Sequence, residues 1–227
     1  MKTLIFTVSF IIITIPFFAQ PFSNLKELKD HGCVLYEPSI TTLINKSIDD
    51  PYGETVYHLL KTKVEKSSSV LYVITFDYGP SEDHTYNIYK ETSSGSLIHI
   101  SEIGAEKLVI PGNGYIYSSG RNNQLYDKKR KFKLSGESLT EVEQGAYYIG
   151  LKTQTNKTIT LYSDKDKKNK TAVLPKNYDI EILIEKNKCI LIKTAFGLTG
   201  WAKLSDLNTY DMTGESLSIK NFYYAGD

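Results

Sequence analysis

Residues 156–206 read NKTITLYSDKDKKNKTAVLPKNYDIEILIEKNKCILIKTAFGLTGWAKLSD, and they are the most informative stretch of the chain. Apolar and polar residues alternate over short runs, and polar clusters separate the runs, as in a small β-structure. The pattern predicts strands at 159–162, 172–174, 179–185, 189–193 and 200–203, followed by a 3₁₀ turn at 204–207. Five short strands with one long first loop predict an SH3-like barrel.

This stretch resembles the bacterial SH3 (SH3b) family. The resemblance depends on Leu161, on the segment Val173-Leu174-Pro175-Lys176 and above all on Thr199-Gly200-Trp201. It implies a barrel that targets peptidoglycan or a protein. Three positions depart from the family pattern: Tyr162 replaces a frequent Arg, Asp164-Lys165 replaces Gly-Pro, and Cys189-Ile190 replaces an aromatic pair. These departures favour a structural or protein-contacting role over recognition of the cell wall.

Three aromatic residues of this region are candidates for a ligand groove: Tyr162, Tyr178 and Trp201. Tyrosine and tryptophan combine a large apolar surface with one polar atom, which suits a binding face. Trp201 has an equally good alternative role, because a barrel this small needs one large aromatic side chain in its core. The sequence leaves both roles open.

The rest of the chain also predicts an all-β fold. Short runs rich in Val, Ile, Tyr and Thr recur about every ten residues, separated by tight turns, which indicates an antiparallel meander that closes as a sandwich or partial barrel. Strands are expected at 55–63, 69–78, 84–91, 97–102, 107–110, 114–118, 124–127, 131–134 and 138–143. Short helical turns are expected at 24–31 and 39–47. No parallel pairing is expected, because no long crossover is visible.

The chain divides into four predicted parts. Residues 1–19 resemble a signal peptide: Lys2 precedes an apolar run at 4–18, and Ala19 offers a cleavage site, which predicts a secreted or periplasmic protein. A tyrosine-rich β domain follows at 20–146, then the barrel at 147–210 and a tail at 211–227.

Charge is distributed unevenly between these parts. Residues 151–207 hold eleven Lys against six Asp and Glu, a net charge of +5, so the rest of a chain of net charge +1 carries −4. The near-neutral total gives no reason to expect nucleic acid as a partner. A basic barrel could dock on the acidic domain within the chain, or it could contact an anionic envelope polymer.

Candidate chemistry is sparse. Cys33 is the only candidate nucleophile for a cell-wall cysteine peptidase, and His58, His84 and His99 are possible bases, but no spacing links any of them to it. His31 with Cys33 is an incomplete zinc motif. Asp164, Asp166 and Asn169 are an incomplete calcium loop among lysines, so no metal or cofactor is expected. Cys33 and Cys189 could form a disulfide or remain two free thiols.

The tyrosines of the first domain could line a sugar or peptide site, and Tyr115 and Tyr117 are expected on one face. A division of these tyrosines between core and surface is favoured.

The sequence therefore predicts an exported, non-enzymatic binding or scaffold protein of the bacterial cell envelope, with cell-wall glycan or peptide or an envelope protein as its partner. Two alternatives remain. One is a cell-wall hydrolase accessory, or a hydrolase with an unrecognised N-terminal site. The other is a structural subunit of an exported complex.

Overall fold

The computed structural model describes residues 22, 24–49, 55–79, 83–135, 137–210 and 216–224. These residues form seventeen strands and two 3₁₀-helices, and no α-helix occurs among them. The all-β prediction is therefore confirmed. The predicted signal peptide lies outside the described residues. Within the described part, neither helix has the length and apolar character that crossing a bilayer requires.

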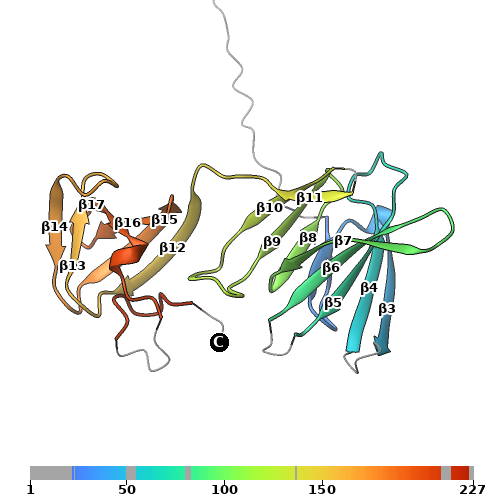
Figure 1. Cartoon of the computed structure of the whole chain (residues 1–227), viewed down its shortest axis with the longest axis horizontal. Coiled ribbons are helices and arrows are strands. Elements are labelled where there is room, and N and C mark those ends of the chain that lie inside the picture. Colours follow the sequence, from blue (N-terminus) through green and yellow to red (C-terminus); the bar gives the residue numbers. More distant parts are fainter. Residues whose placement is uncertain are drawn as a thin grey trace, which may run out of the picture.

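A five-stranded antiparallel sheet forms one layer of the first module, which comprises β1 to β11 and lies on the right in Figure 1. Its strands neighbour one another in chain order, so the predicted meander is confirmed for this sheet. The strands are β3 (Thr41–Asp49), β4 (Thr55–Thr62), β5 (Tyr72–Asp77), β6 (Thr85–Glu91) and β7 (Leu97–Gly104).

The second layer is a six-stranded sheet with the order β1-β2-β8-β9-β10-β11. Its strands are β1 (Lys26–Leu28), β2 (Cys33–Tyr36), β8 (Lys107–Ile110), β9 (Tyr115–Ser119), β10 (Arg130–Ser135) and β11 (Ser138–Glu141). β2 and β8 run parallel, with Val34 opposite Leu108. The expectation of exclusively antiparallel pairing was wrong here. The whole β3–β7 meander serves as the long crossover that a parallel pair needs.

The two layers share one hydrophobic core. Val34, Leu108 and Ile116 come from the second layer, and Ile74 and Ile88 come from the meander; all five are fully buried. Every side chain of this core belongs to the first module. The main core of the first module is therefore built without side chains from the rest of the chain.

Two predicted helical turns were wrong. Residues 24–31 contain β1, which pairs with β2, and residues 39–47 lie mostly in β3, which pairs with β4. The helical part of the second segment is limited to the start, in the 3₁₀-helix η1 (Pro38–Ile40). Segments this short have little intrinsic helical stability, so pairing with neighbouring strands determines their conformation.

The second module, on the left in Figure 1, is a six-stranded sheet with the order β12-β15-β16-β17-β13-β14. Its elements are β12 (Tyr147–Gln154), β13 (Ile159–Tyr162), β14 (Lys170–Leu174), β15 (Asp179–Lys186), β16 (Cys189–Thr194), β17 (Thr199–Lys203) and η2 (Leu204–Asp206). The five predicted strands and the 3₁₀ turn are confirmed. Among the described residues no ladder joins β14 to β12, so the sheet is open. Closure into an SH3-like barrel stays a prediction, as does the sandwich or partial-barrel form of the first module.

The core of the second module includes side chains from outside its own sheet. Leu161, Ile182 and Ile192 come from the strands. Leu125 and Tyr126 come from the first-module loop between β9 and β10. The strand predicted at 124–127 was therefore wrong: its apolar pair is buried against the neighbouring module instead of forming a ladder.

The end of the described chain completes this second core. Ile219 and Phe222 are each 1% exposed. Ile219 forms an isolated bridge with Thr155, and the amide of Lys220 donates to the carbonyl of Gln154 at 2.9 Å. The rings of Phe222 and Tyr126 are parallel, with centroids 6.5 Å apart. Three segments distant in sequence therefore meet in one core.

Candidate functional site

The outer face of the second module carries a row of apolar side chains. Burial alternates along β17, where Gly200 and Ala202 are buried and Trp201 between them is partly exposed. Trp201 lies opposite Tyr162 of β13 on one side and opposite Leu191 of β16 on the other. Because directly opposed residues of antiparallel strands project to the same face, these three side chains form one row across three strands. We call Leu191, Trp201 and Tyr162 the outer row.

A glycine next to Trp201 makes this arrangement possible. A Cβ atom at Gly200 would lie 2.7 Å from the Cβ of Leu161, closer than two carbon atoms can approach. Glycine therefore lets β17 approach β13 closely enough for Leu161 to fill the core. The same approach places Trp201 beside Tyr162 on the outside.

A lysine from the long β13–β14 loop covers the tryptophan. The Nζ of Lys165 lies 4.7 Å from the centroid of the Trp201 ring, within range of a cation–π interaction. Asp164 holds the loop, because its Oδ1 accepts from the amides of Asp166 at 2.9 Å and Lys168 at 3.2 Å. These backbone hydrogen bonds, chiefly that from Lys168, lower the pKa of Asp164. An ion pair between Lys167 and Asp206 ties the loop to η2.

The β16–β17 hairpin ends in an exposed apolar tip. Phe196 is 85% exposed and Leu198 is 48% exposed. Two hydrogen bonds to Thr194 close the turn: the amide of Leu198 donates to Oγ1 at 3.0 Å, and its carbonyl accepts from the Thr194 amide at 2.8 Å. The hairpin that carries Trp201 thus also presents two apolar side chains to solvent.

The structure brings Tyr162 and Trp201 together and places Tyr178 elsewhere. Tyr178 precedes β15, where its amide donates to Thr155 Oγ1 at 2.9 Å and its carbonyl accepts from the Thr155 amide at 3.0 Å. Its partly buried side chain packs against the second core. Lys165, Leu191, Phe196 and Leu198 were not predicted as site residues. The period-2 alternation around Trp201 was the signal that could have identified Leu191.

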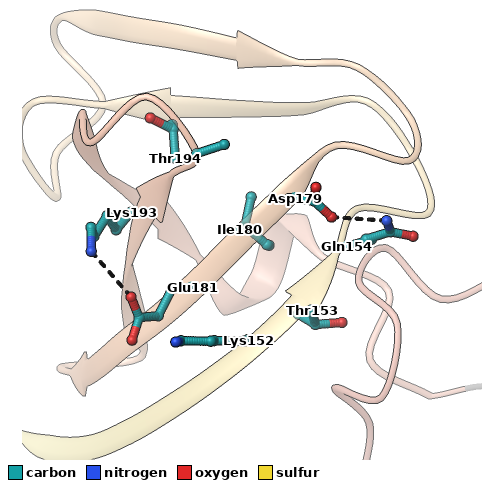
Figure 2. A pocket seen from close by; sticks show the side chains of 9 residues that line it. Lys152, Thr153, Gln154, Asp179, Ile180, Glu181, Lys193 and Thr194 are labelled. Atoms are coloured by element: carbon teal, nitrogen blue, oxygen red, sulfur yellow. Dashed lines mark hydrogen bonds and ion pairs between the residues drawn. The ribbon is translucent and has the colours of Figure 1, made fainter.

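A polar cavity of about 510 Å³ lies at the ends of β12, β15 and β16. Figure 2 shows that each of its two carboxylates contacts a neighbouring side chain. Lys193 meets Glu181 with a 3.3 Å ion pair, and Gln154 donates to Asp179 at 2.8 Å. Each carboxylate of this cavity is therefore already occupied by a neighbouring side chain.

Cys33, the candidate nucleophile, has an environment that suppresses its reactivity. Its Sγ donates to Glu27 Oε1 at 3.4 Å. Burial raises the pKa of the Cys33 thiol, and the hydrogen bond to Glu27 raises it further. Thiolate formation is thus disfavoured, whereas catalytic cysteines have a lowered pKa. Both Cys33 and Cys189 are free thiols in the structure.

The histidines lie in other surroundings. His84 contacts Phe76 and Tyr78, and His99 contacts Tyr89. Burial lowers the pKa of His58. Among the described residues no hydrogen bond links a histidine to Cys33, and no group of three or more His, Cys, Asp or Glu side chains is arranged to hold a metal ion.

The tyrosines of the first module are divided between its core and its surface. Tyr72 and Tyr86 are buried in the core. Tyr115 and Tyr117 share one face, as predicted, with ring centroids 6.4 Å apart and the Nζ of Lys131 3.7 Å from the Tyr115 ring.

Comparisons with protein-family models, curated proteins and solved structures return no match to this chain.

Proposed function

We propose that this chain is an exported, non-enzymatic binding or scaffold protein of the bacterial cell envelope. In this proposal the second module, a member of the SH3b family by resemblance, contacts peptidoglycan or an envelope protein through its outer row. The observation that carries the proposal is the position of Trp201, which points away from the core and lies opposite Tyr162.

Physical chemistry supports a binding role for this face. An indole and a phenol side by side present flat apolar surfaces and one polar atom each, which suits the face of a sugar ring or a peptide side chain. Tryptophan and tyrosine are also the residues that most often dominate the energy of protein interfaces. The ammonium of Lys165 lies over the Trp201 ring, so an anionic partner at this face would gain an electrostatic contact.

The tip of the β16–β17 hairpin adds a second exposed apolar group. Phe196, the most exposed large apolar side chain among the described residues, adds an anchor that a pocket on a partner protein could bury. The environment of Cys33 supports the non-enzymatic part of the proposal, because a thiol with a raised pKa is a poor nucleophile.

A retention assay tests the proposal. The chain from Gln20 onward would be incubated with purified peptidoglycan and, separately, with an envelope extract. We expect retention on one of the two, and we expect Trp201→Ala and Tyr162→Ala each to weaken it by about tenfold, the effect of losing one interface anchor.

Tyr148→Ala is the matched control, because Tyr148 is 64% exposed on β12 of the same module and lies outside the outer row. It should bind as the unaltered chain does. Absence of retention on both materials, or an equal loss in the control, would contradict the proposal.

Export has a separate test. When the full chain is expressed in a bacterium with a secretory pathway, mass spectrometry of the processed protein should find Gln20 as the first residue. An unprocessed chain that remains in the cytoplasm would contradict the proposed location.

A further inference from the structure

A cavity of about 580 Å³ lies where the two modules meet. The first-module loop between β9 and β10 forms one wall, and the β15–β16 turn with the end of β17 forms another. Thr209 and Tyr224, from the last part of the described chain, contribute to the lining. The volume falls within the range of roughly 300–1,000 Å³ that is usual for small-molecule sites, which also favour domain junctions. We call this space the junction cavity.

Three lysines line the junction cavity: Lys128 from the first module, and Lys188 and Lys203 from the second. The lining contains one carboxylate, that of Glu185, and its Oε2 already accepts a 2.6 Å hydrogen bond from Tyr126. Among the described residues none of the three lysines forms an ion pair. The lining therefore has a formal charge of +2. Lys188 is exposed, and Lys128 and Lys203 are partly buried, with the Nζ of Lys128 4.2 Å from the centroid of the Tyr147 ring.

The polar cavity of Figure 2 provides an internal comparison. Its lining holds Lys152 and Lys193 against Asp179 and Glu181, a formal charge of zero, and its side chains bond to one another. An excess of positive charge is therefore a property of the junction cavity and not of every cavity in this lysine-rich module.

The backbone positions of Lys188 and Lys203 are set by a hairpin turn and by strand pairing. Asn187 and Lys188 have φ angles of 53° and 57°, which is the geometry of a two-residue hairpin turn. Glycine is the usual second residue of such a turn, and a lysine there is disfavoured. The carbonyl of Lys188 accepts from the amide of Leu204 at 3.0 Å, and Lys203 lies opposite Cys189. The turn and the end of β17 are thus held together, and a ligand-binding role would account for a lysine at a position that favours glycine.

We propose that the junction cavity binds a small organic anion with at least two carboxylate or phosphate groups, held by Lys128, Lys188 and Lys203. Such a ligand contacts both modules at once, so its binding stabilises their junction by mass action. Lys203 is two residues from Trp201 along β17, but the lining of the junction cavity contains none of the outer-row side chains.

Isothermal titration calorimetry of the chain from Gln20 tests this site, with citrate and pyrophosphate as probes at constant ionic strength. We expect saturable binding of at least one probe, and the preferred one identifies the ligand as carboxylate or phosphate in type. The double variant Lys188→Gln/Lys203→Gln should weaken binding by about tenfold or more, as expected when charged partners are removed. The control Lys157→Gln/Lys176→Gln removes the same charge from exposed positions of the module and should change the affinity less than about twofold.

Lys128→Gln offers a second route, because it alters the site from the first module and remains informative if the double variant fails to fold. Amide shifts in a ¹⁵N-correlation spectrum should cluster at Asn187, Lys188 and Ser205. Trp201→Ala should bind the anion normally even if it abolishes partner retention, which separates this proposal from the proposed function. Lack of saturable binding of either probe, equal weakening in the control, or shifts located elsewhere would overturn the assignment.

Discussion

The two modules bury their apolar surface in different ways. The first core is built entirely from residues of the first module. The second core needs Leu125 and Tyr126 from the first module, and Ile219 and Phe222 from the end of the chain. A small sheet has too little surface to enclose a core alone. We infer that the second module depends on the first for its stability, whereas the first does not depend on the second.

The substitution with the largest expected effect on this difference is Phe222→Ala. Phe222 is 1% exposed, and truncation of a buried phenylalanine costs about 3–5 kcal/mol. The chain contains one tryptophan, Trp201, so its fluorescence reports on the second module. Urea unfolding followed by that signal should shift to lower denaturant, while hydrogen exchange in β5 of the first module should be unchanged.

Phe76→Ala is the reciprocal variant, because Phe76 is fully buried in the first core. It should destabilise the first module and, through Leu125 and Tyr126, also lower the transition reported by Trp201. If Phe222→Ala increased exchange in β5 as much as Phe76→Ala does, the proposed one-way dependence would be wrong.

The sequence predicted the second module better than its surroundings for a physical reason. Its strands alternate apolar and polar residues with period two, a local signal that can be read residue by residue. The contribution of Leu125 and Tyr126 depends on contacts with residues far away in the chain, and an apolar pair in a polar loop looks like a short strand. The parallel pairing of β2 with β8 is equally non-local.

The candidate site was predicted only in part for the same reason. The alternation around Trp201 indicates that Gly200 and Ala202 share one face and Trp201 lies on the other, which is how the structure places them. The contact of Lys165 with Trp201 and the packing of Tyr178 on the second core depend on loop conformations. No periodic pattern in the sequence encodes those conformations.

Removal of the Tyr126 hydroxyl tests a single hydrogen bond at the junction between the modules. It donates to Glu185 at 2.6 Å, and removal of a hydrogen bond to a charged group costs about 1.5–3 kcal/mol. Tyr126→Phe should therefore lower the stability of the second module by that amount at neutral pH. Trp201 fluorescence in urea measures it, and Tyr210→Phe is a control, because Tyr210 is 57% exposed. A variant as stable as the control would show that this hydrogen bond does not hold the junction.

The same residue predicts how stability depends on alkaline pH. Burial, followed by the hydrogen bond to Glu185, raises the pKa of Tyr126 above its ordinary value of 10.0. The folded state therefore favours the neutral phenol. The stability that comes from burying the neutral Tyr126 side chain is fully present below pH 10, and it decreases as the pH rises above that value. Burial likewise raises the pKa of Tyr86 in the first core, so both modules should weaken in this range.

Unfolding measured between pH 8 and pH 11 tests this expectation. Tyr126→Phe should remove part of the pH dependence of the second module and leave that of the first unchanged. An identical profile in the variant and the unaltered chain would contradict the assigned cause.

Gly200→Ala tests how closely β17 approaches β13. The added Cβ would lie 2.7 Å from the Cβ of Leu161, and overpacking of this kind costs about 1–3 kcal/mol. The loss of stability should again be confined to the second module, whose unfolding transition is reported by Trp201 fluorescence. Gly197→Ala is a poor control, because Gly197 has a φ of +97°. Gly145→Ala is better, since a Cβ there meets nothing within 4 Å. Equal stability of the Gly200 and Gly145 variants would rule out the close approach.

The smallest expected effect on stability is that of Trp201→Ala. Trp201 belongs to the outer face, where its described neighbours are Lys165, Tyr162 and Leu191 and no core side chain, so we expect a cost of about 1 kcal/mol or less. Leu161→Ala, which truncates the fully buried side chain next to Tyr162, should cost about 2–5 kcal/mol. Because the first variant lacks tryptophan, circular dichroism and hydrogen exchange in β16 must replace fluorescence. If Trp201→Ala unfolded the module as Leu161→Ala does, the tryptophan would be a core residue, and the outer row would lose its central member. If Trp201→Ala instead leaves the fold intact and abolishes retention, the stability of the second module comes from its inward side chains and from the residues outside its sheet that complete its core. Trp201 is then available for binding.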